Sequence, residues 1–151
     1  MKEKRNIVYS EEYDITFIEL KTTEIEQNNI NFLELDDDDC NNYENLENGL
    51  KMKTLYILHY PKGTCPSISF GKIVEIYTNY SFFHLCNTEG GSSGSPILLK
   101  NNKKVIGIHI GGSKEKEKPY NIGCFLKDFI NKINEEYKKT KKLVKLKKKK
   151  I

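Results

Sequence analysis

The chain contains no tryptophan, only three histidines and only four cysteines among its 151 residues. The cysteines are Cys40, Cys65, Cys86 and Cys124, and no two of them lie in the CxxC spacing of a zinc cluster. Four cysteines allow three disulfide pairings, and the sequence does not choose among them. We therefore expect no metal and no cofactor, with reduced thiols as the default.

Long apolar runs are also missing. No stretch is long enough to cross a bilayer, and the charged beginning MKEKRNIVYS lacks the apolar core of a secretory signal. These absences predict a cytoplasmic protein without a transmembrane segment. With 37% hydrophobic residues the chain can bury a core, and its length suits one compact unit.

The formal net charge of +4 comes from one end of the chain. Nine of the 25 basic residues lie in KKTKKLVKLKKKKI, which has no acid, and the remainder carries 16 basic and 21 acidic residues. A basic surface is therefore not a property of the fold, and no specific nucleic-acid site is expected. The tail is predicted to be disordered, either solvated or in contact with polyanions such as nucleic acid or anionic membrane.

Short strands dominate the hydrophobic pattern, and only one helix is indicated. The helix runs from Leu126 to about Tyr137, where apolar residues recur at the spacing of one helical face. Many short strands with tight turns favour an antiparallel barrel or sandwich. The expected strands are 6–10, 14–20, 30–35, 54–60, 67–77, 80–86, 95–99, 103–110 and 122–126.

The stretch GGSSGSP, residues 90–96, looks like a linker but leads directly into apolar strands. Gly91 and Gly94 bracket two serines and permit a tight, strained turn. Such a turn can aim two backbone N–H groups at one point beside an exposed hydroxyl, which acyl transfer needs. Pro96 would fix the chain direction after it.

The serine turn and the strand that follows it resemble a known family. GGSSGSPIL with KKVIGIHIGG resembles the C-terminal barrel of trypsin-like serine peptidases, nearest the glutamyl-endopeptidase-like branch with its motif G-N-S-G-S-P. YDITFIEL is similar to the aspartate strand of the family. The resemblance implies a mainly β protein, a double antiparallel β-barrel with an incomplete first barrel and a C-terminal helix. The implied parts are a first-barrel remnant (1–45), a second barrel (46–125), a helix (126–142) and a basic tail (143–151).

The resemblance also implies roles for individual residues. Ser93 would be the nucleophile, the N–H groups of Gly91 and Ser93 would form the oxyanion hole, and Asp14 would orient a histidine. His109 and Thr88 match the pocket residues that hold a substrate carboxylate, so an acidic residue before the cleaved bond is a plausible preference. His84 either lines this pocket or packs.

One member of the triad is missing. The family order is histidine, aspartate, serine, and no histidine precedes Asp14. His59 is interpreted as a structural strand residue. The expected function is therefore a serine endopeptidase domain acting on peptides or proteins, truncated and inactive as this chain. The alternative is a catalytically dead module that binds peptides or a protein partner.

Two smaller predictions concern Ser92 and an acidic run. Ser92 stands where animal trypsins have the aspartate that binds a new N-terminus, so that activation switch is not expected. The acidic run from Asp36 to Asp39 lacks the alternating spacing of a calcium loop and is interpreted as solvated.

Overall fold

The computed structural model describes residues 5–36, 49–113, 119–127 and 129–135. The described part is mainly β, as predicted. Its elements are β1 (Ile7–Ser10), β2 (Ile15–Ile18), α1 (Thr22–Gln27), β3 (Thr54–His59), the 3-10 helix η1 (Pro61–Gly63), β4 (Ser67–Thr78), β5 (Ser81–His84), β6 (Pro96–Leu99), β7 (Val105–Gly112) and β8 (Asn121–Phe125).

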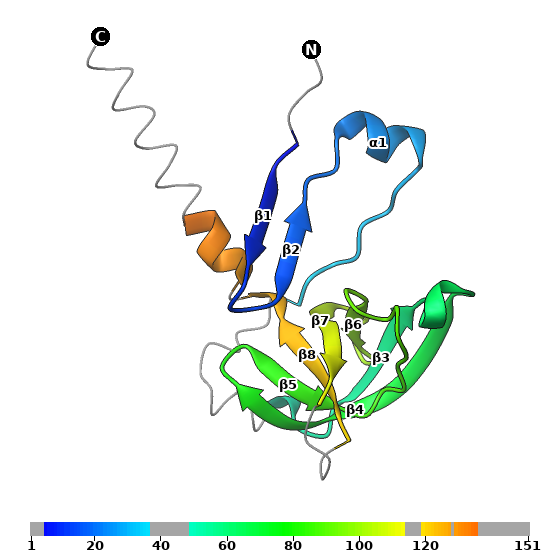
Figure 1. Ribbon diagram of the computed structural model, residues 1–151, viewed down its shortest axis with the longest axis vertical. Helices are drawn as coiled ribbons and strands as arrows, with labels where there is room; N and C mark the ends of the chain where they lie inside the picture. The colour runs from blue at the N-terminus through cyan, green and yellow to red at the C-terminus, as the bar shows by residue number, and fades with distance from the viewer. Residues whose placement is uncertain (1–4, 37–48, 114–118, 128, 136–151) are drawn as a thin grey trace.

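Six of the strands form a closed barrel (Figure 1). Their order around it is β3-β4-β5-β8-β7-β6, and every neighbouring pair is antiparallel. Closure leaves no free strand edge in this sheet. The prediction of an antiparallel β-barrel is confirmed for this half of the molecule.

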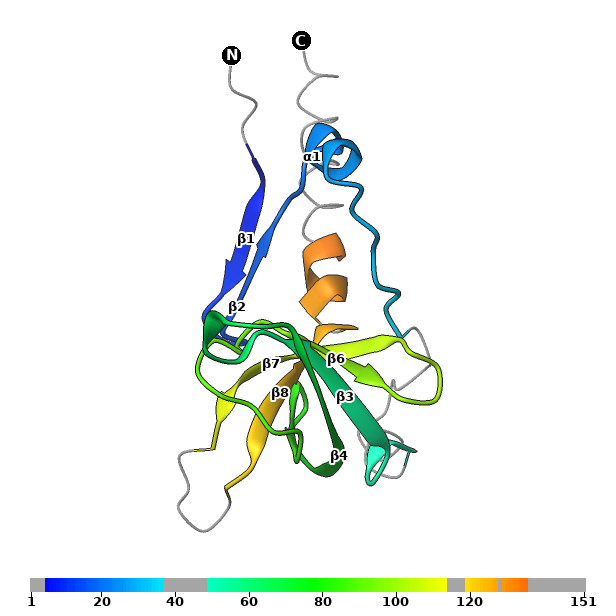
Figure 2. The ribbon, with the colours of Figure 1, turned by 90° about the vertical axis from the view of Figure 1, so that its right-hand side faces the viewer.

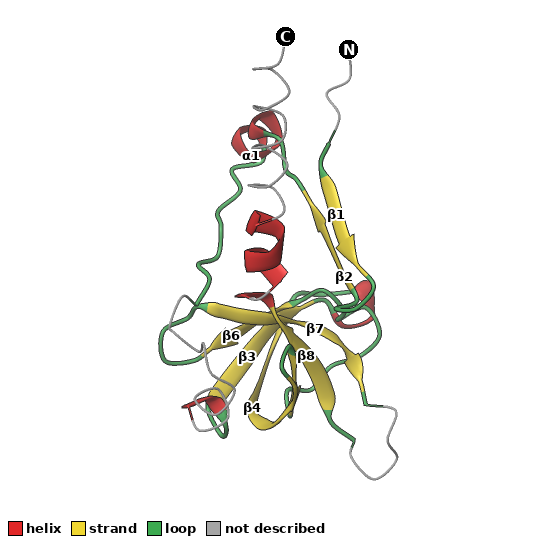
Figure 3. Cartoon of the chain, turned by 90° about the vertical axis from the view of Figure 1, so that its left-hand side faces the viewer, coloured by secondary structure: helices red, strands yellow, loops and turns green. Residues whose placement is uncertain are grey.

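The N-terminal strands form a separate two-stranded sheet. The hairpin pairs β1 with β2 in the register Ile7↔Ile18 to Ser10↔Ile15. Seen from two sides, it stands with the C-terminal helix at one end of the barrel (Figures 2 and 3). One face of the hairpin is apolar and exposed, at Ile7 (59%), Tyr9 (70%) and Ile18 (54%). That this hairpin is the remnant of a first barrel stays a prediction.

Two predictions for the next segment were wrong. Residues 22–27 form a helix, α1, that the sequence reading missed, and residues 30–34 form no strand. The segment touches the barrel sheet through one parallel bridge, Leu35 to Val105. Phe32 is 68% exposed. Residues 30–34 alternate as a strand would, but among the described residues no strand lies beside them to pair with.

Two apolar clusters hold the described part together. One fills the barrel and includes Leu55, Ile57 and Ile97. The other lies between the barrel wall, the hairpin and the C-terminal helix, and includes Leu98 and Phe129. The run Ile97–Leu99 is therefore buried on both faces of β6, which explains why it does not alternate with polar residues.

The predicted C-terminal helix is present, with helical residues at 126–127 and 129–135. Tyr137, the basic tail, Cys40 and the acids at 37–39 lie outside the described residues. The described cysteines, Cys65, Cys86 and Cys124, are not joined in disulfides. In this part of the chain no helix is long and apolar enough to span a membrane.

Candidate active site

The serine turn connects the end of β5 to the start of β6 and is sharply bent. Gly91 and Gly94 have positive φ angles of 89° and 82°, where a side chain would be strained. A Cβ at Gly91 would also lie 3.1 Å from the backbone nitrogen of Gly63. Glycine is thus required at position 91 both by the turn and by the close approach of η1.

Backbone hydrogen bonds fix the turn from two sides. On one side, Lys62 N–H donates to the Gly90 carbonyl (2.7 Å). On the other, Gly94 N–H donates to the His109 carbonyl (2.7 Å) and His109 N–H donates to Ser95 (2.9 Å). The turn is therefore a rigid part of the barrel rim and not a linker.

Ser93 is exposed at this turn, whereas its neighbour Ser92 is fully buried. Among the described residues, no hydrogen bond engages the N–H of Gly91, the N–H of Ser93 or the Ser93 hydroxyl. These are the groups an acyl-transfer site must keep available for a substrate carbonyl.

The turn also makes a buried contact that the sequence reading missed. His59 Nδ1 lies 2.8 Å from Ser92 Oγ, and Glu89 N–H donates to the same oxygen (3.2 Å). The register Ile57↔Ile97 carries His59 alongside position 95, which brings its ring to the turn. A serine–histidine contact of this length can mark a nucleophile and its base, but no substrate can reach Ser92 because it is 0% exposed.

The other two histidines form a second contact behind the turn. Cys86 N–H donates to His84 Nδ1 (3.3 Å), so the ring proton of His84 resides on Nε2. His84 Nε2 lies 3.3 Å from His109 Nδ1. A hydrogen bond between the His109 ring and the backbone of Ile122 favours the protonated ring. Both rings are buried, at 0% and 3% exposure.

Burial keeps these imidazoles neutral. It lowers the pKa of His84 to about 3, with a smaller effect from the neighbouring His109. Burial also lowers the pKa of His109. The hydrogen bond to the Ile122 backbone raises this pKa in part, and the neighbouring His59 lowers it further. Burial raises the pKa of the Cys86 thiol to about 12, so Cys86 is not a nucleophile at neutral pH.

The pKa of His84 predicts acid destabilisation. Because the unfolded chain binds this proton below about pH 6.5 and the native chain does not, stability is full above that pH and falls as pH drops toward 3. His84 alone should cost about 2 kcal/mol of unfolding free energy between pH 7 and pH 5. Urea titrations at both pH values measure this loss. His84→Asn keeps an acceptor for Cys86 N–H and should make the unfolding free energy less dependent on pH, by the uptake of one proton. An unchanged pH dependence would show that His84 is not the titrating group.

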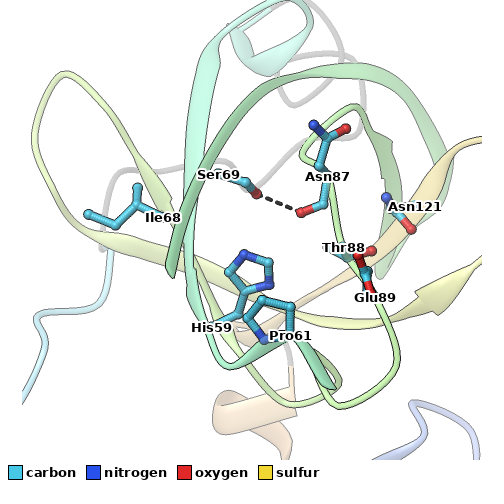
Figure 4. A pocket seen from close by; sticks show the side chains of 8 residues that line it. All are labelled: His59, Pro61, Ile68, Ser69, Asn87, Thr88, Glu89 and Asn121. Atoms are coloured by element: carbon cyan, nitrogen blue, oxygen red, sulfur yellow. Dashed lines mark hydrogen bonds between the residues drawn. The ribbon is translucent and has the colours of Figure 1, made fainter. Parts of the chain in front are cut away.

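A polar cavity of about 580 Å³ lies beside the turn (Figure 4). Thr88, predicted as a pocket residue, is in its wall, whereas His84 and His109 are not among its lining residues. Ser69 donates to the Asn87 carbonyl (2.7 Å) across one side. The lining residues are His59, Pro61, Ile68, Ser69, Asn87, Thr88, Glu89 and Asn121.

Asp14 lies in the turn between β1 and β2, with a positive φ of 51°. It is exposed, and no described residue forms a hydrogen bond or ion pair with its carboxylate. Its side chain is thus available to a further group. The role of Asp14 stays a prediction, as do those of Ser93, Gly91, Thr88, His84 and His109.

The described part thus combines a closed antiparallel barrel with a glycine-bracketed serine turn on its rim, as the resemblance to trypsin-like peptidases implies. The sequence model of the trypsin-like peptidase domain matches residues 2–108. The chain therefore belongs to the trypsin-like peptidase domain family. The glutamyl-endopeptidase-like branch stays a prediction.

Solved structures show the same fold. Eighteen chains match, among them the crystal structure of Rv3671c from M. tuberculosis H37Rv, a serine-to-alanine mutant in its inactive form. The TM-score is 0.59 at 12% identity, over 87% of this chain and 64% of that one. This chain thus spans less than two thirds of the length of that protein. No curated protein sequence matches.

Proposed function

We propose that this chain is the nucleophile-bearing part of a serine endopeptidase domain. The observation that carries the proposal is the serine turn: Ser93 is exposed between two positive-φ glycines, and the N–H groups beside it are uncommitted. Ser93 Oγ attacks the scissile carbonyl carbon, and the N–H groups of Gly91 and Ser93 stabilise the resulting oxyanion.

The proton of Ser93 must leave for a base that this chain does not supply. All three of its histidines are buried and engaged with other groups: His59 with Ser92, and His84 with His109. In the family mechanism a histidine oriented by Asp14 takes the proton and returns it to the leaving amine. Without that histidine, we expect little turnover, of the order of the residual 10³–10⁴-fold over water.

The same observation favours a second candidate function. A barrel that keeps its peptide-binding surface but has no imidazole available as a general base would act as a binding module for extended peptides. In either function the acidic residue before the scissile bond stays a prediction. Since burial lowers the pKa of His109, a positive charge there appears only in acid.

A serine-reactive fluorophosphonate separates the two functions. We expect slow labelling of the chain, faster when free imidazole replaces the missing base, and no labelling of Ser93→Ala. Asp14→Asn should reduce the acceleration by imidazole but leave the slow reaction. Ser95→Ala, on the same turn, is the matched control. A folded protein that is not labelled with imidazole present would favour the binding module.

A further inference from the structure

The cavity beside the serine turn contains one imidazole, and it is not the one that the sequence suggested. His59 lies in the cavity wall with Thr88 and Asn121. His84 and His109 use their ring nitrogens inside the protein, in contacts with each other and with the backbone of Cys86 and Ile122. His59 is therefore the imidazole placed to meet a bound peptide.

The hydrogen bonds of Ser92 define the tautomer of His59. Ser92 Oγ already accepts from Glu89 N–H and is fully buried, so its own proton needs an acceptor. Within the described part of the chain, His59 Nδ1, 2.8 Å away, is the one neighbour that can accept it. A proton on Nδ1 would instead leave the Ser92 O–H unsatisfied in a buried site. The ring proton thus belongs on Nε2.

The Nε2 atom faces space that a ligand can enter. It has no hydrogen-bond partner among the described residues. Yet no buried side-chain nitrogen or oxygen in this part of the chain lacks a partner. Since Nε2 is unpaired, it must retain accessible surface, and the cavity is the space that its ring lines (Figure 4).

We propose that His59 is both a positioning residue of the nucleophile turn and a specificity-determining residue of the pocket. Its Nδ1 accepts the Ser92 proton and holds the residue before Ser93, while its Nε2–H donates into the cavity. The group it binds is a substrate side chain with an acceptor oxygen, a carboxamide or a carboxylate. This proposal rests on the proposed peptide-handling function and adds the residue that selects the substrate side chain.

The first test needs neither activity nor a variant. Two-bond ¹H–¹⁵N correlation spectra of the full chain report the tautomer of each histidine. We expect His59 with its proton on Nε2. A proton on Nδ1 would overturn the positioning half of the proposal, whether or not the chain labels with a fluorophosphonate. The test is therefore independent of the proposed reaction.

The second test uses three blocked peptides that differ only in Gln, Glu or Met at the position before the scissile bond. The first two should shift the His59 Nε2–H resonance and bind more tightly than the Met peptide. His59→Asn keeps an acceptor oxygen near the Nδ1 position but has no group that reaches the cavity. It should reduce the discrimination against Met about 3- to 10-fold.

His59→Gln is the complementary variant, because its amide lies near the Nε2 position and Ser92 loses its acceptor. It should slow the labelling of Ser93 more than His59→Asn does, and should retain more of the discrimination against Met. Unchanged discrimination in His59→Asn would overturn the specificity half. If no peptide binds the wild type, that half fails together with the proposed function, and the tautomer alone decides the positioning role.

Discussion

Gly91→Ala is expected to slow the labelling of Ser93 by about 100-fold, the cost of losing one oxyanion-hole donor. The φ angle of Gly91 is 89°, where a side chain is strained by about 1–3 kcal/mol. A Cβ would also lie 3.1 Å from Gly63 N and 3.2 Å from Tyr60 O. The turn must relax, and the N–H of residue 91 then turns away from Ser93. The rate with a fluorophosphonate and imidazole measures the effect.

Gly90→Ala is the matched control for this prediction. A Cβ at Gly90 meets nothing within 4 Å, and its φ is not positive. The fluorophosphonate should label Gly90→Ala at a rate within a few-fold of the wild-type rate, and both variants should remain folded. If Gly91→Ala labelled as fast as Gly90→Ala, the geometry of the turn would not contribute to the reactivity of Ser93.

Gly107→Ala is expected to destabilise the barrel by about 3 kcal/mol or more, a large part of the stability of a domain this size. A Cβ at position 107 would lie 2.3 Å from the carbonyl oxygen of Cys124 and 3.3 Å from the Phe82 ring. The first contact is with backbone on the paired strand β8, which cannot move without breaking the ladder. Urea unfolding measures the loss.

Gly111 provides the comparison, because it lies on the same strand and a Cβ there meets nothing within 4 Å. Gly111→Ala should change stability by no more than about 0.5 kcal/mol. Equal losses in the two variants would show that β7 and β8 do not approach each other closely at Gly107.

The strands and the serine turn could be predicted because their signals are local. Alternation marks β3, where Leu55 and Ile57 point into the barrel, and the glycines of GGSSGSP mark the turn. The same alternation extends to His59, which is buried with them. The alternation along β3 therefore predicted that His59 points inward. Only the pairing of β3 with β6 shows that its ring contacts Ser92.

The remaining features depend on contacts distant in the sequence or on weak local signals. Helix α1 has only six residues and begins after Lys21, a poor N-cap; its capping interaction is Glu24 accepting from Lys21 N–H (2.8 Å). Residues 30–35 alternate as a strand should, but alternation needs a partner strand to pair with. The contact between His84 and His109 joins strands β5 and β7, which are separated in the barrel by β8.

Mass-spectrometric mapping of the fluorophosphonate adduct tests the central claim most directly, because the turn holds three serines and only one of them should react. With imidazole present, the account predicts an adduct on Ser93 alone, with none on buried Ser92. An adduct on another residue, or none on a chain that is shown to be folded, would contradict it.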